Sequence, residues 1–201
     1  MRTRAQRAAD AAIDVIAEHG MRALTHRAAD ARAALPPGST SSCFRTRHAL
    51  LDAVLRRMLE LDEASLTRLP PSAWSSREQV AATLTGLLEH WLGPARTRTR
   101  ARMELYLDAT AGALLRTELD AAAERFLHMA TDGLRAAGVP DPGNAARMLV
   151  AQLDGVLFAA LARPSPATKG GTEGGTWLRY AAETIVRGIP PATHEQEPGR
   201  E

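Results

Sequence analysis

The residues best suited to chemistry lie between Thr25 and Leu51, where hydroxyl side chains, arginines and two adjacent prolines occur together. The segment reads THRAADARAALPPGSTSSCFRTRHALL. Arginine binds phosphate through charge and hydrogen bonds, and small hydroxyls contact phosphates or base edges. A short helix, a proline-enforced turn and a second short helix would present these groups together, as a helix-turn-helix module does in the DNA major groove. The segment therefore predicts binding to double-stranded DNA.

Two kinds of DNA contact are expected from this segment. Phosphate contacts are assigned to Thr25, Arg27, the backbone of Gly38, Arg45 and Arg47. Base-edge contacts are assigned to Ser39, Thr40 and Ser42, with His26 as a further candidate and Arg45 as an alternative base reader. Ser41 and His48 complete the expected DNA-binding set. The alternative interpretation is a solvated polar turn whose hydroxyls only cap helices.

The neighbouring residues predict the elements that would position this surface. Apolar residues at helical spacing predict a helix over 3–19, which Gly20 ends. Thr25 is a predicted N-cap for a second helix that reaches about residue 34, because Pro36 forces the residue before it out of the helical region. Pro37 is then expected to open a third helix, and Thr46 to cap a fourth.

The rest of the chain predicts further helices and no strands. Ser76 is expected to cap a helix after the loop PPSAWSS, and further helices are expected over residues 95–111, 113–137, 144–162 and 176–188. Residues 164–175 are rich in Gly, Pro, Ser and Thr and are expected to be flexible, and the tail from residue 190 has no apolar periodicity. We therefore predict an all-α protein of about nine helices.

Charge is distributed unevenly along the chain. Residues 1–57 contain ten arginines and five acidic residues, a net charge of +5, whereas residues 58–201 have a net charge of −3. This asymmetry is typical of a small nucleic-acid-binding domain attached to a separate body, although chance variation on a solvated surface gives the same result.

Several classes of protein are disfavoured. No run approaches about 18 apolar residues, and the basic N-terminus lacks the apolar segment of a secretory signal, so we expect a cytoplasmic protein without a membrane span. The single cysteine, Cys43, excludes a disulfide framework and is more typical of a packing residue than of a redox switch. The six histidines show no metal-binding spacing, and no phosphate loop or nucleophile elbow occurs, so no enzymatic activity, cofactor or metal is expected.

The N-terminal segment resembles the TetR family of bacterial transcriptional regulators. The resemblance rests on Gly20, Thr25 and the run GSTSSCFRTRHALL from Gly38 to Leu51, and it spans about residues 5–57. The blocks RMELYLDAT, LRAAGVPDP and LVAQLDGVL extend a weaker similarity into the body. The resemblance implies a three-helix helix-turn-helix DNA-binding domain at 1–47, a helical effector-binding and dimerisation domain at 48–189, and a tail at 190–201 that we expect to be disordered.

The resemblance also implies partners and further sites. It implies a homodimer in which each N-terminal domain reads half of a near-palindromic operator, with an interface on the last two helices. We assign that interface to Leu149, Leu153, Val156, Leu157, Trp177, Leu178, Ala181 and Ile185. It further implies a small-molecule effector, for which the large body side chains are the candidates. These are Trp91, Arg102, Met103, Tyr106, Phe126, Met129, Met148, Gln152 and Phe158, each of which is otherwise a core or surface residue.

The segment departs from the family pattern at several positions. Ser41, Ser42 and Cys43 stand where a tyrosine is common, and Ala34 replaces the usual turn glycine. Asp30 replaces a small apolar residue, and Pro36 replaces a capping Ser or Thr. We therefore expect DNA contacts through small hydroxyls and arginine. The leading hypothesis is a repressor released from DNA by its effector; the alternative is a dimeric small-molecule- or partner-binding protein with weakened or lost DNA binding.

Overall fold

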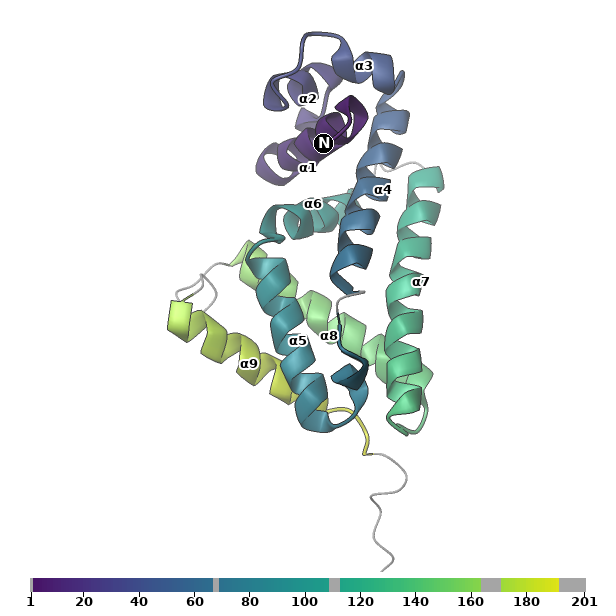
Figure 1. Ribbon diagram of the computed structural model, residues 1–201, viewed down its shortest axis with the longest axis vertical. Helices are drawn as coiled ribbons and strands as arrows, with labels where there is room; N and C mark the ends of the chain where they lie inside the picture. Colours follow the sequence, from purple (N-terminus) through teal and green to yellow (C-terminus); the bar gives the residue numbers. More distant parts are fainter. Residues whose placement is uncertain (1, 67–68, 109–112, 164–170, 192–201) are drawn as a thin grey trace, which may run out of the picture. The chain divides into compact units, whose positions relative to one another are not determined.

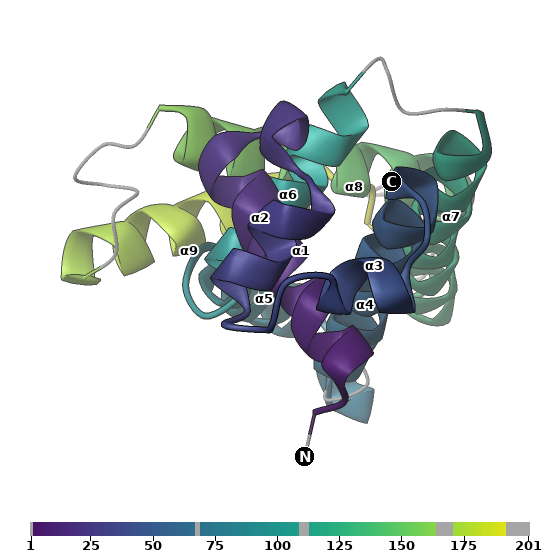
Figure 2. The same cartoon turned by 90° about the horizontal axis from the view of Figure 1, so that it is seen from above.

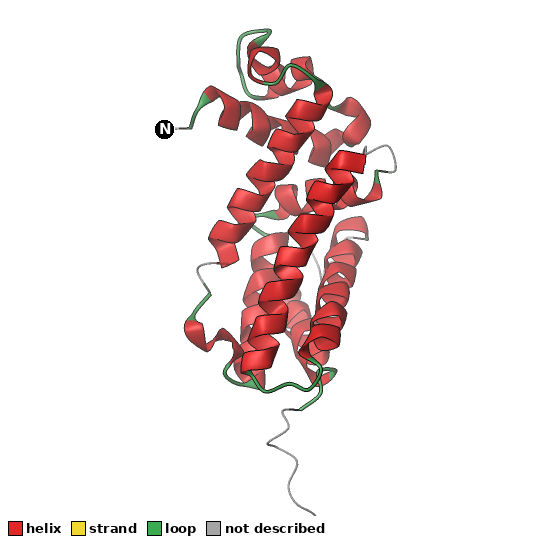
Figure 3. Ribbon diagram, turned by 90° about the vertical axis from the view of Figure 1, so that its right-hand side faces the viewer, coloured by secondary structure: helices red, strands yellow, loops and turns green. Residues whose placement is uncertain are grey.

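The computed structural model describes residues 2–66, 69–108, 113–163 and 171–191. Within those ranges every regular element is a helix, which confirms the all-α prediction (Figure 3). The α-helices are α1 Arg4–His19, α2 His26–Arg32, α3 Ser39–Cys43, α4 Arg47–Leu66, α5 Arg77–Leu92, α6 Arg96–Leu107, α7 Ala113–Ala136, α8 Pro142–Ala162 and α9 Gly171–Arg187. Two 3-10 turns, η1 Met21–Ala23 and η2 Pro71–Trp74, lie in the connections.

The caps predicted from sequence are present at three helices. The Thr25 hydroxyl accepts a hydrogen bond from the Ala28 N–H at 3.0 Å. The hydroxyls of Thr46 and Ser76 accept from the third residue beyond each of them, at 3.0 and 3.2 Å. Gly20 ends α1 with φ +77°, a conformation that a side chain would strain. Local capping chemistry therefore predicted the starts of α2, α4 and α5 correctly.

Several predicted boundaries were wrong, and one is the end of α6, predicted at residue 111 but found at Leu107. Pro37 does not open the third helix: both prolines lie in the turn, and α3 begins at Ser39 after Gly38, whose φ is +86°. Residues 171–175, expected to be flexible, form the first turns of α9. Packing of α9 along α5 stabilises a segment whose glycines alone disfavour a helix. Residues 164–170, and residues 192–201 of the predicted tail, lie outside the described residues.

The chain divides into two compact units, and the first is Met1–Arg68 with Pro94–Ala122. Its centre is α1, which packs against α2, α3, α4 and α6 (Figure 1). Ile16 of α1 and Leu50 and Met58 of α4 are fully buried in its core. Because α4 and α6 complete this core, the compact unit continues past the predicted boundary at residue 47. The functional division at that residue stays a prediction.

The second compact unit is Leu69–Gly93 with Ala123–Glu201. Here α5 packs against α9 and α8, and α8 also contacts α9 (Figure 1). The core is aliphatic: Leu84 and Leu88 of α5 and Leu149 and Leu157 of α8 have almost no exposed surface. This unit contains the two helices that the family resemblance assigns to dimerisation.

Candidate DNA-binding surface and effector site

Helices α2 and α3 form a helix-turn-helix. Figure 2 views the first unit from the side on which these two helices lie. The turn between them reverses the chain with two residues of positive φ, Ala34 at +49° and Gly38 at +86°. The Leu35 N–H donates to the Asp30 carbonyl at 2.9 Å and closes the end of α2. Ala34 occupies a left-handed conformation that normally favours glycine, so this turn is held by its surroundings.

A carboxylate from α2 caps the start of α3. Gly38, the N-cap residue of α3, has no side chain to make a capping bond. Instead, the Asp30 carboxylate accepts hydrogen bonds from the Gly38 N–H at 2.8 Å and the Thr40 N–H at 2.7 Å. It accepts a third from the Thr40 hydroxyl at 2.6 Å. Asp30 thus supplies the cap that Gly38 cannot make, which explains this departure from the family pattern. The prediction that Pro36 occupies the capping position was wrong, because the N-cap residue is Gly38.

The same hydrogen bonds determine the ionisation of Asp30. Burial of the carboxyl group acts to raise its pKa, because a charged group is poorly solvated there. The hydrogen bonds from Thr40 and Gly38 outweigh burial and hold the pKa of Asp30 below its usual value of 3.8. The Asp30 carboxylate is therefore charged at neutral pH. Its negative charge lies at the N-terminal end of α3, where the helix dipole favours an anion.

A histidine from α2 binds the other end of α3. Nε2 of His26 lies 2.7 Å from the carbonyl oxygen of Phe44, the C-cap residue of α3. A carbonyl only accepts, so the ring donates through Nε2–H. His26, a predicted base-edge candidate, is half-buried and engaged in this bond.

The predicted DNA-binding residues separate into exposed and buried groups. The exposed ones are Thr25, Arg27, Gly38, Ser41, Ser42, Arg45, Arg47 and His48. Ser39 and Thr40 are buried at 7% and 0% exposure, and the Thr40 hydroxyl is bonded to Asp30. A side chain without exposed surface does not reach a base edge, so the structure contradicts a base-reading role for Thr40 and gives it a positioning role. Arg47 also serves the fold, since its guanidinium donates to the Met21 carbonyl at 2.6 Å.

The predicted effector-site residues are divided between the two units. Arg102, Met103 and Tyr106 lie on α6 in the first. The guanidinium of Arg102 pairs with the buried Asp62 carboxylate at 2.9 Å. Arg98 pairs with the same carboxylate at 2.7 Å. This cluster is a structural feature of the first unit.

In the second unit one aromatic pair stands out. Trp91 is buried, and its ring lies 6.1 Å from that of the half-buried Phe126, with the planes tilted by 55°. Met129 is half-buried one turn further along α7. Met148 and Gln152 instead line a surface pocket of about 270 Å³ beside the end of α9. Phe158 is exposed. Within the second unit, the predicted residues therefore lie in more than one place: Trp91 with Phe126, and Met148 with Gln152.

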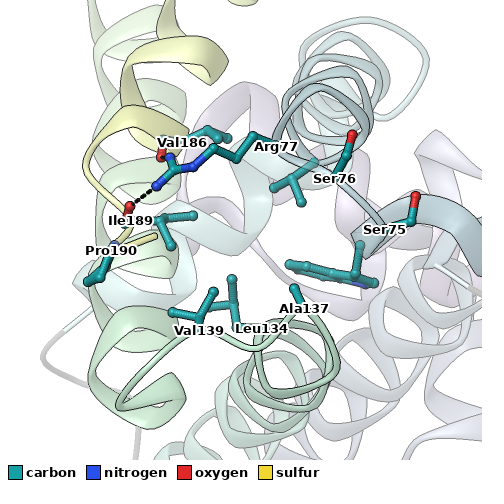
Figure 4. Close-up of a pocket in the computed structure, with 11 residues that line it drawn as sticks. Ser75, Ser76, Arg77, Leu134, Ala137, Val139, Val186, Ile189 and Pro190 are labelled. Carbon is teal, nitrogen blue, oxygen red and sulfur yellow. Dashed lines mark hydrogen bonds between the residues drawn. The ribbon is translucent and has the colours of Figure 1, made fainter. Parts of the chain in front are cut away.

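A smaller pocket of about 100 Å³ involves Arg77, a residue that was not singled out from the sequence. Trp74, Leu134 and Val139 line it, and Arg77 crosses its edge (Figure 4). Arg77 donates to the carbonyls of Val186 and Ile189, at 2.7 and 2.5 Å, and so caps the end of α9. An arginine at the first position of a helix is unfavourable for that helix's own dipole, and this was the available signal that it serves another element.

Most residues predicted for the dimer interface are buried in the chain's own core. Leu149, Leu153, Leu157, Leu178 and Ile185 are at most 7% exposed, and Val156, Trp177 and Ala181 are half-buried. The five buried side chains cannot also form an outer surface. The exposed large apolar residues on the same two helices are different ones: Met148 at 60% and Phe158 at 46% on α8, and Tyr180 at 62% on α9.

Helix α8 is therefore apolar on two faces, one inside the second unit and one outside. By length and composition it is the one helix of the described residues that could cross a membrane. This is weak evidence for a membrane span, because core helices of soluble proteins pass the same test.

Comparisons with known proteins agree with this architecture. Residues 75–191 match a family model described as tetracyclin repressor-like, C-terminal domain. A TetR-family structure from Streptomyces coelicolor A3 has 33% sequence identity and a TM-score of 0.71, covering 94% of this chain and 99% of that one. The multidrug binding protein EbrR, complexed with imidazole, has 34% identity and a TM-score of 0.66, covering 97% and 100%. EbrR is also found complexed with ethidium, at 34% identity, a TM-score of 0.64, and 94% and 99% coverage.

A transcriptional regulator from Rhodococcus sp. Rha1 shares the fold at 20% identity, with a TM-score of 0.76 and coverage of 93% and 96%. No curated protein matches the chain.

Proposed function

Because this chain belongs to the TetR family of transcriptional regulators, we propose that it is a dimeric repressor that a small-molecule effector releases from its operator. The observation that supports this best is the helix-turn-helix of α2 and α3, which presents exposed hydroxyls and arginines on one segment. Effector binding would change the separation of the two recognition helices, which must be about 34 Å to enter successive major grooves.

The proposed DNA contacts follow from exposure. Ser41 and Ser42 lie on the exposed side of α3 and are the proposed base-edge residues, although both hydroxyls also donate to carbonyls within the helix. Arg27 and Arg45 are the proposed phosphate contacts, and no ion pair to either is present in the part of the chain that the structure describes. Thr25, Gly38, Arg47 and His48 complete the set. Hydroxyls discriminate bases weakly, so affinity should depend mainly on phosphate contacts.

The proposed dimer interface is the outer apolar face of α8 together with the exposed side of α9. Met148 and Phe158 on α8 and Tyr180 on α9 are the large apolar side chains there. Covering these residues with a second copy would remove apolar surface from water, which is the main driving force of association. Their exposure in the single chain supports this interface over one formed by the buried leucines that the family resemblance suggests.

The proposed effector is an aromatic small molecule that contacts the Trp91–Phe126 pair. An aromatic ring that entered beside this pair would make stacking or edge contacts with the two tilted rings. Met129 would add an adaptable apolar contact. The complexes of EbrR with imidazole and ethidium support an effector of this class.

The proposal is tested by selecting genomic DNA fragments on the purified full chain. The expected result is enrichment of one near-palindromic sequence, bound by two chains. Ligand screening by thermal stabilisation is performed in parallel, with ethidium as the first probe. Stabilisation by the probe without any enriched DNA would contradict the repressor function and favour the alternative of a small-molecule-binding protein that has lost DNA binding.

A further inference from the structure

Helix α3 cannot be stable by itself. It has five residues, far fewer than the 12–15 or so that an isolated helix needs in water. Its N-cap residue, Gly38, makes no side-chain capping bond, and two prolines precede it. Its conformation must therefore be imposed by tertiary contacts, which include packing against α1 and hydrogen bonds at both of its ends.

Both ends of α3 are bound from α2. Asp30 accepts from the Gly38 and Thr40 N–H groups at the start of α3, and His26 bonds the Phe44 carbonyl at its end. Asp30 and His26 are four residues apart on α2, so they lie on the same face of that helix. The carboxylate lies at the positive end of the α3 dipole and the ring N–H at the negative end, which is the favourable arrangement at each.

We infer that Asp30 and His26 are positioning residues, which together fix the orientation of α3 relative to α2. The consequence for DNA rests on the proposed function: Ser41, Ser42 and Arg45 follow the orientation of α3, so a loosened α3 would present them in many orientations. The free energy needed to order these residues on binding would then reduce the affinity for DNA. Neither Asp30 nor His26 needs to touch DNA for this effect.

The test uses variants of the full chain that differ in single hydrogen-bonding groups. Asp30→Asn keeps the size of the side chain but removes its charge, and Thr40→Val removes only the hydroxyl bond. Thr40→Ser keeps that bond and is the conservative rescue. Asp14→Asn is the matched control: Asp14 is a carboxylate of α1 in the same unit, and its ion pair is with Arg32 of α2 rather than with a residue of α3. His26→Leu and His26→Gln examine the other end, because the amide of Gln can still donate.

The first readout needs no DNA. Amide hydrogen exchange is followed by NMR at Gly38 and Thr40, with amides in the middle of α4 as an internal reference. In Asp30→Asn we expect exchange at these two amides to accelerate about tenfold or more while α4 is unchanged, since opening is local. Equal acceleration in α3 and α4 would indicate a merely structural role and overturn the inference. If Asp30→Asn does not fold, Thr40→Val gives the same comparison.

The second readout is affinity for the selected operator, measured at a temperature where circular dichroism shows each variant fully folded. Asp30→Asn and His26→Leu should bind about tenfold more weakly, the factor that about 1.4 kcal/mol of lost preorganisation produces. Thr40→Ser, His26→Gln and Asp14→Asn should bind like the natural chain. Unchanged affinity in Asp30→Asn would overturn the inference. A natural chain that binds no DNA would overturn the proposed function, while the exchange data would still decide the positioning role.

Discussion

The Thr40 hydroxyl donates a hydrogen bond to the Asp30 carboxylate at 2.6 Å, and the Thr40 backbone N–H donates to the same carboxylate at 2.7 Å. This pair joins the two helices of the DNA-binding module across the proline turn. It also explains why Thr40, a hydroxyl in the middle of the recognition segment, is unavailable to DNA. The hydroxyls that remain exposed on α3 are those of Ser41 and Ser42.

The Asp30 cap predicts a specific loss of stability in acid. Because the folded chain holds the pKa of Asp30 below 3.8, the charged carboxylate stabilises the fold fully above that pH, and this contribution is lost as pH falls through the lower folded-state value. The free energy of unfolding of the natural chain and of Asp30→Asn should therefore differ most near neutral pH and converge below pH 3.8. Urea titrations across this range check it; a difference that is constant with pH would contradict the charged cap.

The buried carboxylate of Asp62 should be among the most sensitive positions for stability. Its side chain is 3% exposed and pairs with both Arg98 and Arg102. Asp62→Asn removes the negative charge that both guanidinium groups contact, so it should cost about 3–5 kcal/mol in the free energy of unfolding. The matched control is Asp132→Asn, whose exposed pair with Arg135 should matter by less than about 0.5 kcal/mol. Equal effects of the two substitutions would contradict a special electrostatic role for the buried Asp62 carboxylate.

Dimer formation should depend on the exposed apolar residues of α8 and α9. Phe158→Glu and Tyr180→Glu place a charge where the second copy would exclude water, so analytical ultracentrifugation should detect monomers at concentrations where the natural chain is dimeric. Leu107→Glu is the control, because Leu107 is 70% exposed on α6 in the other unit. The interface assignment fails if the two variants stay dimeric, or if Leu107→Glu dissociates as readily.

The sequence predicted the helices well because their signals are local. Thr25, Thr46 and Ser76 are capping residues, and each caps the expected helix. The start of α3 was missed because its cap comes from Asp30, eight residues before Gly38, and no rule of local capping includes that distance. The early start of α9 was missed because packing on α5 overrides a glycine-rich composition.

The candidate sites were less predictable, because periodicity identifies an apolar residue without saying which neighbour covers it. Helix α8 has apolar residues on two sides, and the sequence does not say which side is buried. The fold shows that Leu149 and Leu157 face inward, whereas Met148 and Phe158 face outward. Arg102 illustrates the same limit for charge, since its partner Asp62 is forty residues away. The sequence gives the type and spacing of these residues, whereas their contact partners are known only from the structure.

Salt-dependent binding to the selected operator tests the central claim most directly. The dissociation constant of the full chain is measured by fluorescence anisotropy over a series of salt concentrations, for the natural chain and for Arg27→Ala, Arg45→Ala and Arg135→Ala. If Arg27 and Arg45 bind phosphates, Arg27→Ala and Arg45→Ala should each weaken binding. Each should also reduce the magnitude of the slope of the logarithm of the dissociation constant against the logarithm of the salt concentration by about one. Arg135→Ala, on the surface of α7, should change neither the affinity nor the slope. Identical slopes for all four chains, or no operator binding at low salt, would contradict the account.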